Sequence, residues 1–333
     1  MSDETAALRE LVTDLAANHE APQAGDLPEA WANVTELGLH GIGVAEEAGG
    51  SGGTLAHLAV IVDALGEVAI GVPIIEVATA RWVLAHSDSG IDAQLPIVVL
   101  ADEAEPSGVL TGVPWGRSAD LLIVYTTSGP PRAYWMSDPS ITVTTGVNLA
   151  GEQSDSIDLG AATGHDLPWA PTASEVRARL GLLWASALTG AMRGAYTKSR
   201  DHVRTREQFG APLIKIPAVA SAVATFRTHL LLAEAAVARA VETLAGEKGS
   251  DVLDSVASAR IVAAAGATEA TRLAHQLHGA MGVTHEDGLY RLTTRLWAWQ
   301  DAETSERDWA IHLGDKAIER GEDAVWSELT HAF

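Results

Sequence analysis

Apolar side chains recur at helical spacing in the first part of the chain. Leu8, Leu11 and Leu15 lie three or four residues apart, and a second apolar stretch ends at Gly38. This period places the apolar side chains on one face of an α-helix, and glycine commonly ends a helix. We therefore expect helices within residues 4–37 and a further helix over residues 54–66.

The segment between these helices, residues 41–53, is rich in glycine. Glycine-rich loops can cradle phosphates, but this one lacks the Lys-Ser/Thr pair of a P-loop and follows no expected strand. We interpret the segment as a tight connection between helices, with a phosphate-binding loop as the alternative.

The pattern changes at Leu95, where short runs of β-branched and other apolar residues begin. Glycine, proline and serine separate these runs, and no helical period lies between them. Strands spaced this closely predict a small antiparallel sheet or barrel, which should end near Pro168. The expected strands cover residues 97–100, 121–125, 133–136 and 141–144.

Helical periodicity returns after Pro168 and continues to the end of the chain. Thr172 and Glu175 are spaced as a capping box, and apolar residues from Val176 to Ala195 recur on one face. We expect a long helix to about Arg206, helices over 217–245 and 251–277, a short helix before Trp297, and a last pair from about Thr304. This is an α+β fold, mostly α, with a helical domain (1–94), a β-domain (95–168) and a helical bundle (169–333).

Composition excludes several classes of function. The formal net charge of −22 argues against nucleic acid as a partner, because that binding needs a basic face. The chain has no cysteine, so disulfides, thiol nucleophiles and cysteine-ligated metals are excluded. No run approaches the roughly 20 apolar residues of a membrane helix, and the acidic N-terminus lacks the pattern of a signal peptide. We expect no membrane association and a cytoplasmic location.

The segment Arg204-Thr205-Arg206-Glu207-Gln208-Phe209-Gly210 lies where the first long helix should end. The guanidinium groups could hold a pyrophosphate, and the ring of Phe209 could cover an aromatic ligand. The alternative is that these arginines only compensate the helix macrodipole.

A second polar motif lies at the end of the 251–277 helix. Gln276 could hydrogen-bond a ligand there, and Gly279 and Gly282 would let that ligand approach the backbone closely. A metal site is the alternative, although a catalytic zinc normally has a more regular ligand set and we expect no metal. Its ligands would be His275, His278, His285 and Glu286.

Glu303 lies in a highly charged segment before the last pair of helices. A carboxylate in such a run is most often solvated or placed at a helix N-terminus, and a catalytic role is the alternative. No order of serine, histidine and aspartate and no paired carboxylates stand out elsewhere.

In combination, these segments resemble the acyl-CoA dehydrogenase family. The Arg206 to Gly210 segment is similar to the family's Arg-x-x-Phe-Gly signature, and the Gln276 to Gly282 segment is similar to its Gln-x-x-Gly-Gly-x-Gly motif. The stretch from Leu39 to Gly53 and the order of domains also match. The resemblance implies the acyl-CoA dehydrogenase fold, with an N-terminal helical domain, a small middle β-domain and a C-terminal four-helix bundle.

The resemblance also implies FAD-dependent α,β-dehydrogenation of an acyl-CoA substrate to the 2-enoyl-CoA. In the family a carboxylate takes the α proton and the flavin receives the β hydride. The two family positions for this base fall on Glu303 and on Leu180, so Glu303 is the catalytic candidate. The cofactor-binding candidates implied by the resemblance are Arg206, Gln208, Phe209, Gln276, Gly279, Gly282 and Ser305.

The middle domain departs from the family pattern. Residues 101–115 are visibly shorter than the family segments that pack on the flavin. The chain therefore resembles the short subunit of heteromeric actinobacterial acyl-CoA dehydrogenases of steroid side-chain catabolism, in which a larger acyl-CoA dehydrogenase subunit completes the site. This implies a hetero-oligomer, with an electron-transfer flavoprotein as acceptor. The alternatives are a self-sufficient homo-oligomer that uses Glu303 and a flavin-free structural subunit.

Overall fold

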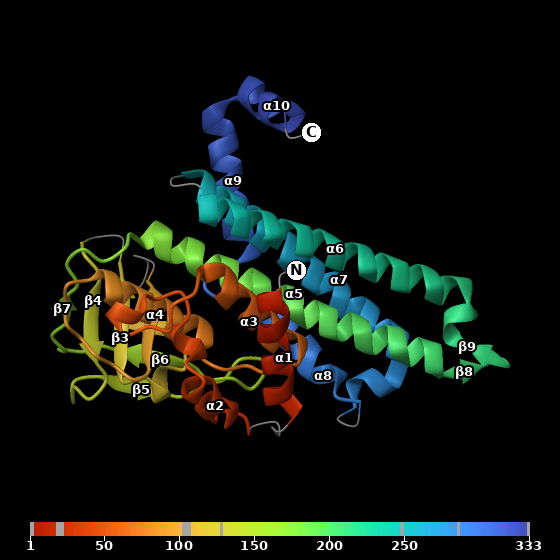
Figure 1. Ribbon diagram of the computed structural model, residues 1–333, viewed down its shortest axis with the longest axis horizontal. Helices are drawn as coiled ribbons and strands as arrows, with labels where there is room; N and C mark the ends of the chain where they lie inside the picture. Colours follow the sequence, from red (N-terminus) through yellow and green to blue (C-terminus); the bar gives the residue numbers. More distant parts are fainter. Residues whose placement is uncertain are drawn as a thin grey trace.

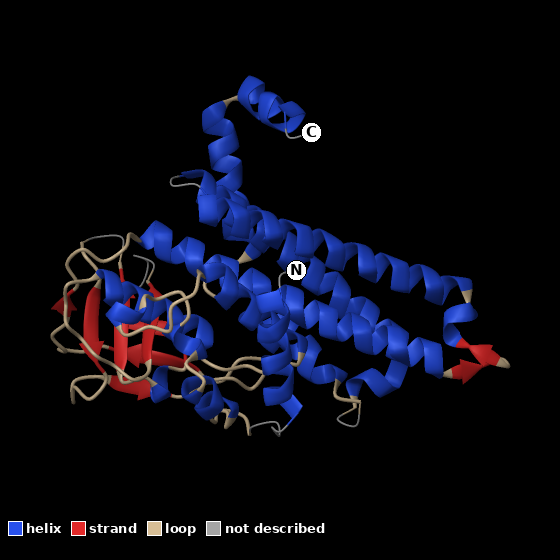
Figure 2. Ribbon diagram, in the orientation of Figure 1, coloured by secondary structure: helices blue, strands red, loops and turns tan. Residues whose placement is uncertain are grey.

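The computed structural model describes residues 3–17, 23–101, 108–126, 129–246, 250–284 and 287–331. Helices make up the N-terminal part, small sheets the middle, and long helices the C-terminal part (Figures 1 and 2). The order helical, β, helical agrees with the prediction. Residues 102–107 of the shortened segment of the middle domain lie outside the described residues.

The N-terminal helices are α1 (Asp3–Ala17), α2 (Ala30–Glu36), α3 (Leu55–Glu67) and α4 (Ile74–His86). A capping box starts α3, because the Thr54 hydroxyl accepts from the backbone N–H of His57 and the His57 ring accepts from the N–H of Thr54. The glycine-rich segment before it contains two 3₁₀ turns, η1 (Leu39–Gly41) and η2 (Glu46–Ala48), closed by a bridge between Val44 and Gly52. The segment connects helices, as predicted.

The strands form a sheet of order β1-β3-β4-β7 and another of order β2-β6-β5. The prediction of an antiparallel sheet was wrong for β1 and β3, which pair in parallel, with Ile97 opposite Leu122. A parallel pair needs a crossover between its strands, and here the crossover includes β2. The bounds are β1 (Pro96–Leu100), β2 (Val109–Pro114), β3 (Leu121–Tyr125), β4 (Arg132–Trp135), β5 (Thr142–Thr144), β6 (Ser154–Asp158) and β7 (His165–Asp166).

The C-terminal bundle consists of α5 (Ala173–Thr205), α6 (Pro217–Gly246), α7 (Ser250–His278) and α8 (Leu289–Trp299), followed by α9 (Glu306–Arg320) and α10 (Glu322–His331). The predicted capping box at Thr172 and Glu175 begins α5, and its predicted apolar face from Val176 to Ala195 is buried. In Figure 1, α5 (green) runs the length of the molecule from the sheets to the opposite end. Within the described ranges, no helix combines the length and hydropathy that crossing a bilayer requires.

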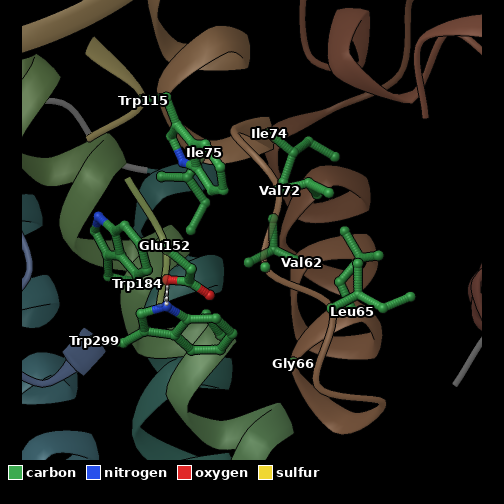
Figure 3. A pocket seen from close by; sticks show the side chains of 13 residues that line it. Val62, Leu65, Gly66, Val72, Ile74, Ile75, Trp115, Glu152, Trp184 and Trp299 are labelled. Atoms are coloured by element: carbon green, nitrogen blue, oxygen red, sulfur yellow. Dashed lines mark hydrogen bonds between the residues drawn. The ribbon is translucent and has the colours of Figure 1, made fainter. Parts of the chain in front are cut away.

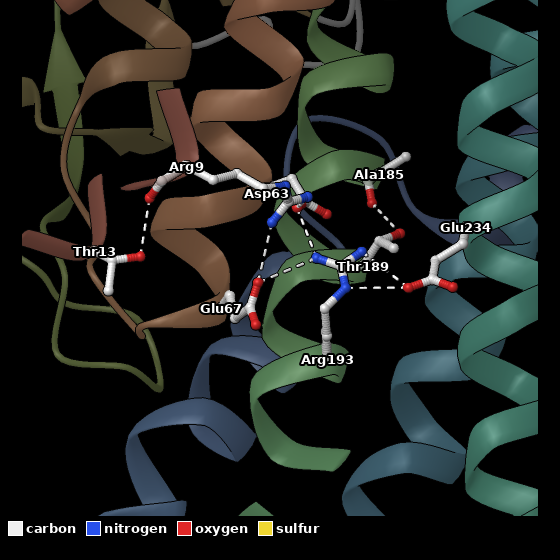
Figure 4. Close-up of polar contacts among 8 residues, drawn as sticks. All are labelled: Arg9, Thr13, Asp63, Glu67, Ala185, Thr189, Arg193 and Glu234. Carbon is white, nitrogen blue, oxygen red and sulfur yellow. Dashed lines mark hydrogen bonds and ion pairs between the residues drawn. The ribbon is translucent and has the colours of Figure 1, made fainter. Parts of the chain in front are cut away.

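Small residues bring α3 and α5 into close contact. A Cβ atom on Gly190 would lie 1.8 Å from the backbone oxygen of Asp63, so only glycine fits there. Beside this contact the Arg193 guanidinium lies 2.7 Å from Asp63 and 3.0 Å from Glu234 on α6, and Arg9 on α1 also pairs with Asp63 (Figure 4). This network joins the N-terminal helices to the bundle.

Candidate functional site

Glu303 lies on the loop between α8 and α9, in the wall of a cavity of about 380 Å³. The cavity is lined by α4, the strands and the α5 side of the bundle. The Glu303 side chain is 7% exposed, its Oε1 lies 3.2 Å from Nε of Arg177, and its Oε2 has no hydrogen-bond partner among the described residues. Leu180, the other family position for a base, lines the same cavity.

The groups around Glu303 act on its pKa in opposite directions. Burial raises the pKa of Glu303, while the Thr304 hydroxyl and the guanidinium groups of Arg177 and Arg260 oppose that rise. Glu303 also has a φ of 65°, a left-handed backbone conformation that costs a non-glycine residue on the order of 1 kcal/mol and is found most often at functional sites. The carboxyl group is thus held at the cavity wall in a strained loop.

Arg260 on α7 holds this loop in place. Its guanidinium donates to the backbone oxygens of Gln300, Ala302 and Thr304 at 2.9, 3.1 and 3.2 Å. Arg260 is 1% exposed, and burial lowers its pKa to about 10, which leaves the group charged at neutral pH. A buried cation that satisfies several carbonyl groups of one loop fixes the course of that loop.

Tryptophan side chains form much of the remaining wall. Trp115, Trp184 and Trp299 line both the main cavity and a small adjoining void (Figure 3). Glu152 lies between them, where its Oε2 accepts from the Trp299 indole at 2.9 Å and its Oε1 lies 3.0 Å from Nε of Arg295. This part of the wall is therefore aromatic, with fixed polar groups beside it, as in a small-molecule site.

The predicted cofactor residues of the 206–210 segment lie at the other end of α5. Arg206 is the C-cap of α5, and β8 (Glu207–Gln208) and β9 (Ala211–Pro212) form a hairpin beyond it. Figure 2 shows this hairpin projecting past the ends of α5 and α6. Phe209 at its tip is 95% exposed, and Arg206 and Gln208 are also exposed.

The residues of the second motif lie near this hairpin. The end of α7 packs on the end of α5, because the His278 ring stacks on His202 with centroids 4.5 Å apart. Gln276 is exposed and accepts from Arg272, and Gly279 is exposed in a left-handed turn. Gly282 is buried and shapes the η5 turn (Gly279–Val283). The structure thus gathers these residues around one end of the bundle.

Within one chain, a large distance separates the Glu303 cavity from the hairpin that carries Phe209. Arg177, which contacts Glu303, and Arg206 lie about 29 residues apart on α5, which at 1.5 Å per residue is roughly 44 Å. A single dinucleotide cannot reach both groups in one chain. Within one chain, the hairpin end and the Glu303 cavity are therefore too far apart to bind the same dinucleotide.

Models of two acyl-CoA dehydrogenase domains match the chain, the N-terminal domain at residues 2–94 and the C-terminal domain at residues 177–300. The chain belongs to the acyl-CoA dehydrogenase family. Family membership makes it an oxidoreductase of the class that acts on the CH–CH bond of acyl-CoA, and the family generally binds FAD.

Individual relatives agree with this assignment. Acyl-CoA dehydrogenase IpdE2 of Mycolicibacterium smegmatis is 27% identical over 304 residues, which cover 86% of this chain and 90% of that protein. The structure of the ChsE4-ChsE5 complex from Mycobacterium tuberculosis superposes with a TM-score of 0.83 over 97% of this chain and 99% of that chain, at 20% identity. The Tcur3481-Tcur3483 steroid ACAD variant gives a TM-score of 0.83 over 94% of this chain and 97% of that chain, at 19% identity. These superpositions confirm the predicted acyl-CoA dehydrogenase fold.

The exposed groups at the hairpin end fit part of a dinucleotide such as FAD. The Arg206 guanidinium makes no ion pair with a described residue, so its fork of donors is available to a pyrophosphate. The Gln276 amide adds hydrogen-bonding capacity, and the exposed ring of Phe209 offers a stacking face. Ser305 differs from these residues, because its hydroxyl caps α9 by accepting from the backbone N–H of Asp308.

The alternative metal site of the sequence analysis falls only partly within the described residues. The Nε2 atom of His275 lies 3.1 Å from the Thr293 hydroxyl. His285 and Glu286 lie outside the described residues. Ligand atoms of His202, His278 and Asp287 lie within 4.8 Å of one another, but Nζ of Lys198 lies 3.2 Å from Asp287 and competes with a cation.

Three side chains near the cavity were not predicted from the sequence: Arg177, Arg260 and Glu76. Arg260 could have been found from its helical position, because it shares the apolar face of α7 with Val256 and Ala267. A charged residue on such a face signals a buried polar contact.

Proposed function

We propose that this chain carries out FAD-dependent α,β-dehydrogenation of an acyl-CoA thioester as one subunit of a hetero-oligomer. The observation that carries the proposal is the buried Glu303 carboxyl group in the wall of the 380 Å³ cavity, with Oε2 unpartnered among the described residues. A group placed in this way can take a proton from a carbon held in the cavity. The cavity volume is at the lower end of the range for small-molecule sites, which suits an acyl group.

The residues around Glu303 have distinct roles in this proposal. Glu303 takes the α proton at Oε2, while Arg177 at Oε1 stabilises the ionised form that can act as a base. Arg260 fixes the loop and so keeps the carboxyl group at the wall. Bound FAD supplies the acceptor for the β hydride.

The opposite end of the bundle would serve a neighbouring subunit. Arg206, Gln208 and Phe209 on the hairpin, with Gln276 and Gly279 beside it, would contact FAD held largely by that subunit. The separation of roughly 44 Å along α5 supports this division, since these residues cannot reach the Glu303 cavity of their own chain.

A larger acyl-CoA dehydrogenase subunit is the partner we propose. The similar structures named ChsE4-ChsE5 complex and Tcur3481-Tcur3483 steroid ACAD each pair two different chains, which supports a hetero-oligomer and a steroid-type acyl group. An electron-transfer flavoprotein is the proposed electron acceptor. The second candidate is a homo-oligomer in which two copies exchange hairpins, and the same two-ended geometry favours it.

The test is co-expression with a candidate larger acyl-CoA dehydrogenase subunit, followed by measurement of flavin content and of flavin bleaching by acyl-CoA. We expect Glu303→Gln to lower kcat by about 10²- to 10⁴-fold, the usual contribution of a general base, with flavin content unchanged. Phe209→Ala should instead lower flavin content, whereas Trp169→Ala, an exposed aromatic away from the hairpin, should not. Unchanged turnover in Glu303→Gln would refute the base, and full flavin occupancy and bleaching in the isolated chain would favour the homo-oligomer.

A further inference from the structure

Glu76 is a second buried carboxyl group in the wall of the same cavity. It lies in the first turn of α4 and is 2% exposed. Neither of its side-chain oxygens has a hydrogen-bond partner on another described residue. Burying a carboxyl group without partners is unfavourable, so a residue of this kind requires a reason beyond packing.

Capping of α4 does not supply that reason. A glutamate in the first turn often bonds the backbone N–H of the N-cap residue, but the N-cap of α4 is Pro73, which has no N–H. The nearby carboxyl group of Glu152 shows the contrast, because Trp299, Asn148 and Arg295 all contact it. The Glu76 carboxyl group has no comparable set of protein partners and faces the cavity.

The charge of the cavity wall limits the kinds of chemical group that can bind beside Glu76. The described lining residues include Glu76, Glu152, Asp301 and Glu303 but no lysine, arginine or histidine. An acyl group with a second carboxylate would therefore meet like charges in a partly enclosed space. Burial raises the pKa of Glu76 to about 8, and Glu152 adds to that rise while the Glu76 backbone N–H opposes it. At neutral pH the group is mostly a carboxylic acid, which has one O–H donor.

We propose that Glu76 donates a hydrogen bond to a neutral oxygen, a ketone, ether or hydroxyl group, on the acyl part of the substrate at a position remote from the thioester. The inference rests on the proposed function, because it places the acyl group in the Glu303 cavity. It makes the preferred substrate an oxygenated acyl-CoA, and it disfavours both plain hydrocarbon chains and dicarboxylic acyl groups. A site built to hydrogen-bond an oxygen rejects an analogue that lacks it, since its own polar group then remains unpaired.

The experiment uses the flavin-loaded assembly of the full chain with its partner subunit. The probes are acyl-CoAs of one carbon skeleton that are unsubstituted, carry a ketone at successive carbons, or end in a carboxylate. We expect a kcat/KM at least about tenfold higher for one keto compound than for the unsubstituted one, because the oxygen satisfies Glu76. The carboxylate compound should be the poorest substrate.

Variants of Glu76 give the decisive comparison. Glu76→Leu should lose the preference for the keto compound, so that the kcat/KM values of the keto and unsubstituted compounds become about equal. Glu76→Gln should keep part of the preference, because its amide can still donate. Thr79→Val is the matched control, because Thr79 is a buried residue on the same helix whose hydroxyl also has no described partner and does not line the cavity. It should keep the full preference.

The outcomes separate this inference from the proposed function. If the assembly oxidises unsubstituted chains best, or if Glu76→Leu affects both compounds equally, Glu76 does not recognise an acyl oxygen. If Glu76→Leu lowers flavin content and leaves the ratio of kcat/KM values unchanged, Glu76 contacts the cofactor instead. If no acyl-CoA is oxidised, the proposed function fails, and calorimetric binding of the same compounds then decides whether Glu76 still discriminates between them.

Discussion

Replacing Glu76 with glutamine should remove a pH dependence from the stability of the chain. The pKa of Glu76 is raised from 4.5 to about 8 in the folded protein, chiefly by burial. Between these values the folded state keeps a proton that the unfolded state has lost. The free energy of unfolding falls with rising pH wherever the folded state binds more protons than the unfolded state. This holds for Glu76 between pH 4.5 and about 8, so Glu76 makes the folded protein less stable as the pH rises through this range.

The size of the effect follows from the two pKa values. Each pH unit inside this window changes the free energy of unfolding by at most about 1.4 kcal/mol, which gives roughly 2.5 kcal/mol between about pH 5 and pH 7. Glutamine has nearly the same shape and no titrating proton. Glu76→Gln should therefore be more stable than the wild type at pH 7 by about 2.5 kcal/mol more than at pH 5.

Urea denaturation of both proteins across this pH range, followed by circular dichroism, measures the difference directly. All other titrating groups are shared, so they cancel when the variant is compared with the wild type. Glu36→Gln is the control, because this carboxylate at the end of α2 is exposed and should leave the slope unchanged. Parallel pH profiles for the wild type and Glu76→Gln would refute the assignment of a buried neutral acid.

Two further predictions concern the base and the helix contact. Arg177→Met removes a charge that lowers the pKa of Glu303, so the acidic limb of the kcat/KM profile of the active assembly should move to higher pH. An unmoved limb would mean that Glu303 is not the titrating base. Gly190→Ala forces a Cβ atom against the Asp63 backbone oxygen and should destabilise the chain by roughly 1–3 kcal/mol in urea, whereas Gly314→Ala, whose Cβ meets nothing, should be neutral or slightly stabilising. Equal effects of the two alanines would contradict the close packing of α3 on α5.

The helical parts of the fold could be predicted because their signals are local. The capping box at Thr172 and the apolar period after it define α5 without reference to any other segment. The pairing of β1 with β3 is different, since nothing in either strand specifies its neighbour or the parallel direction. The strand β2 was missed for a related reason, because its register with β6 shifts between Leu110 and Val113 and breaks the alternation that reveals a strand.

The candidate site was predictable only where a motif carried it. Phe209 and Gln276 belong to short segments that resemble family signatures, and the structure brings these segments to the same end of the bundle. Arg260 donates to carbonyl groups about 40 residues further along the chain. Glu76 lies in a run of apolar residues that predicts only a buried core segment. Such contacts form only when the chain folds, so no local sequence pattern predicts them.

The length of α5 constrains any assembly that these chains form. Each chain carries a cavity with Glu303 at one end and the hairpin with Phe209 at the other. Under the proposed function, a complete site would combine the hairpin of one chain with the cavity of another. In a homodimer both sites would be equivalent, and each chain would bind one flavin. In a heterodimer the two sites differ, because one combines this chain's cavity with the partner's hairpin and the other has the reverse arrangement. Two flavins per heterodimer would place a working site at Glu303, whereas one flavin, lost with Phe209→Ala, would place the chemistry in the partner's cavity and leave this chain as the contributor of the hairpin.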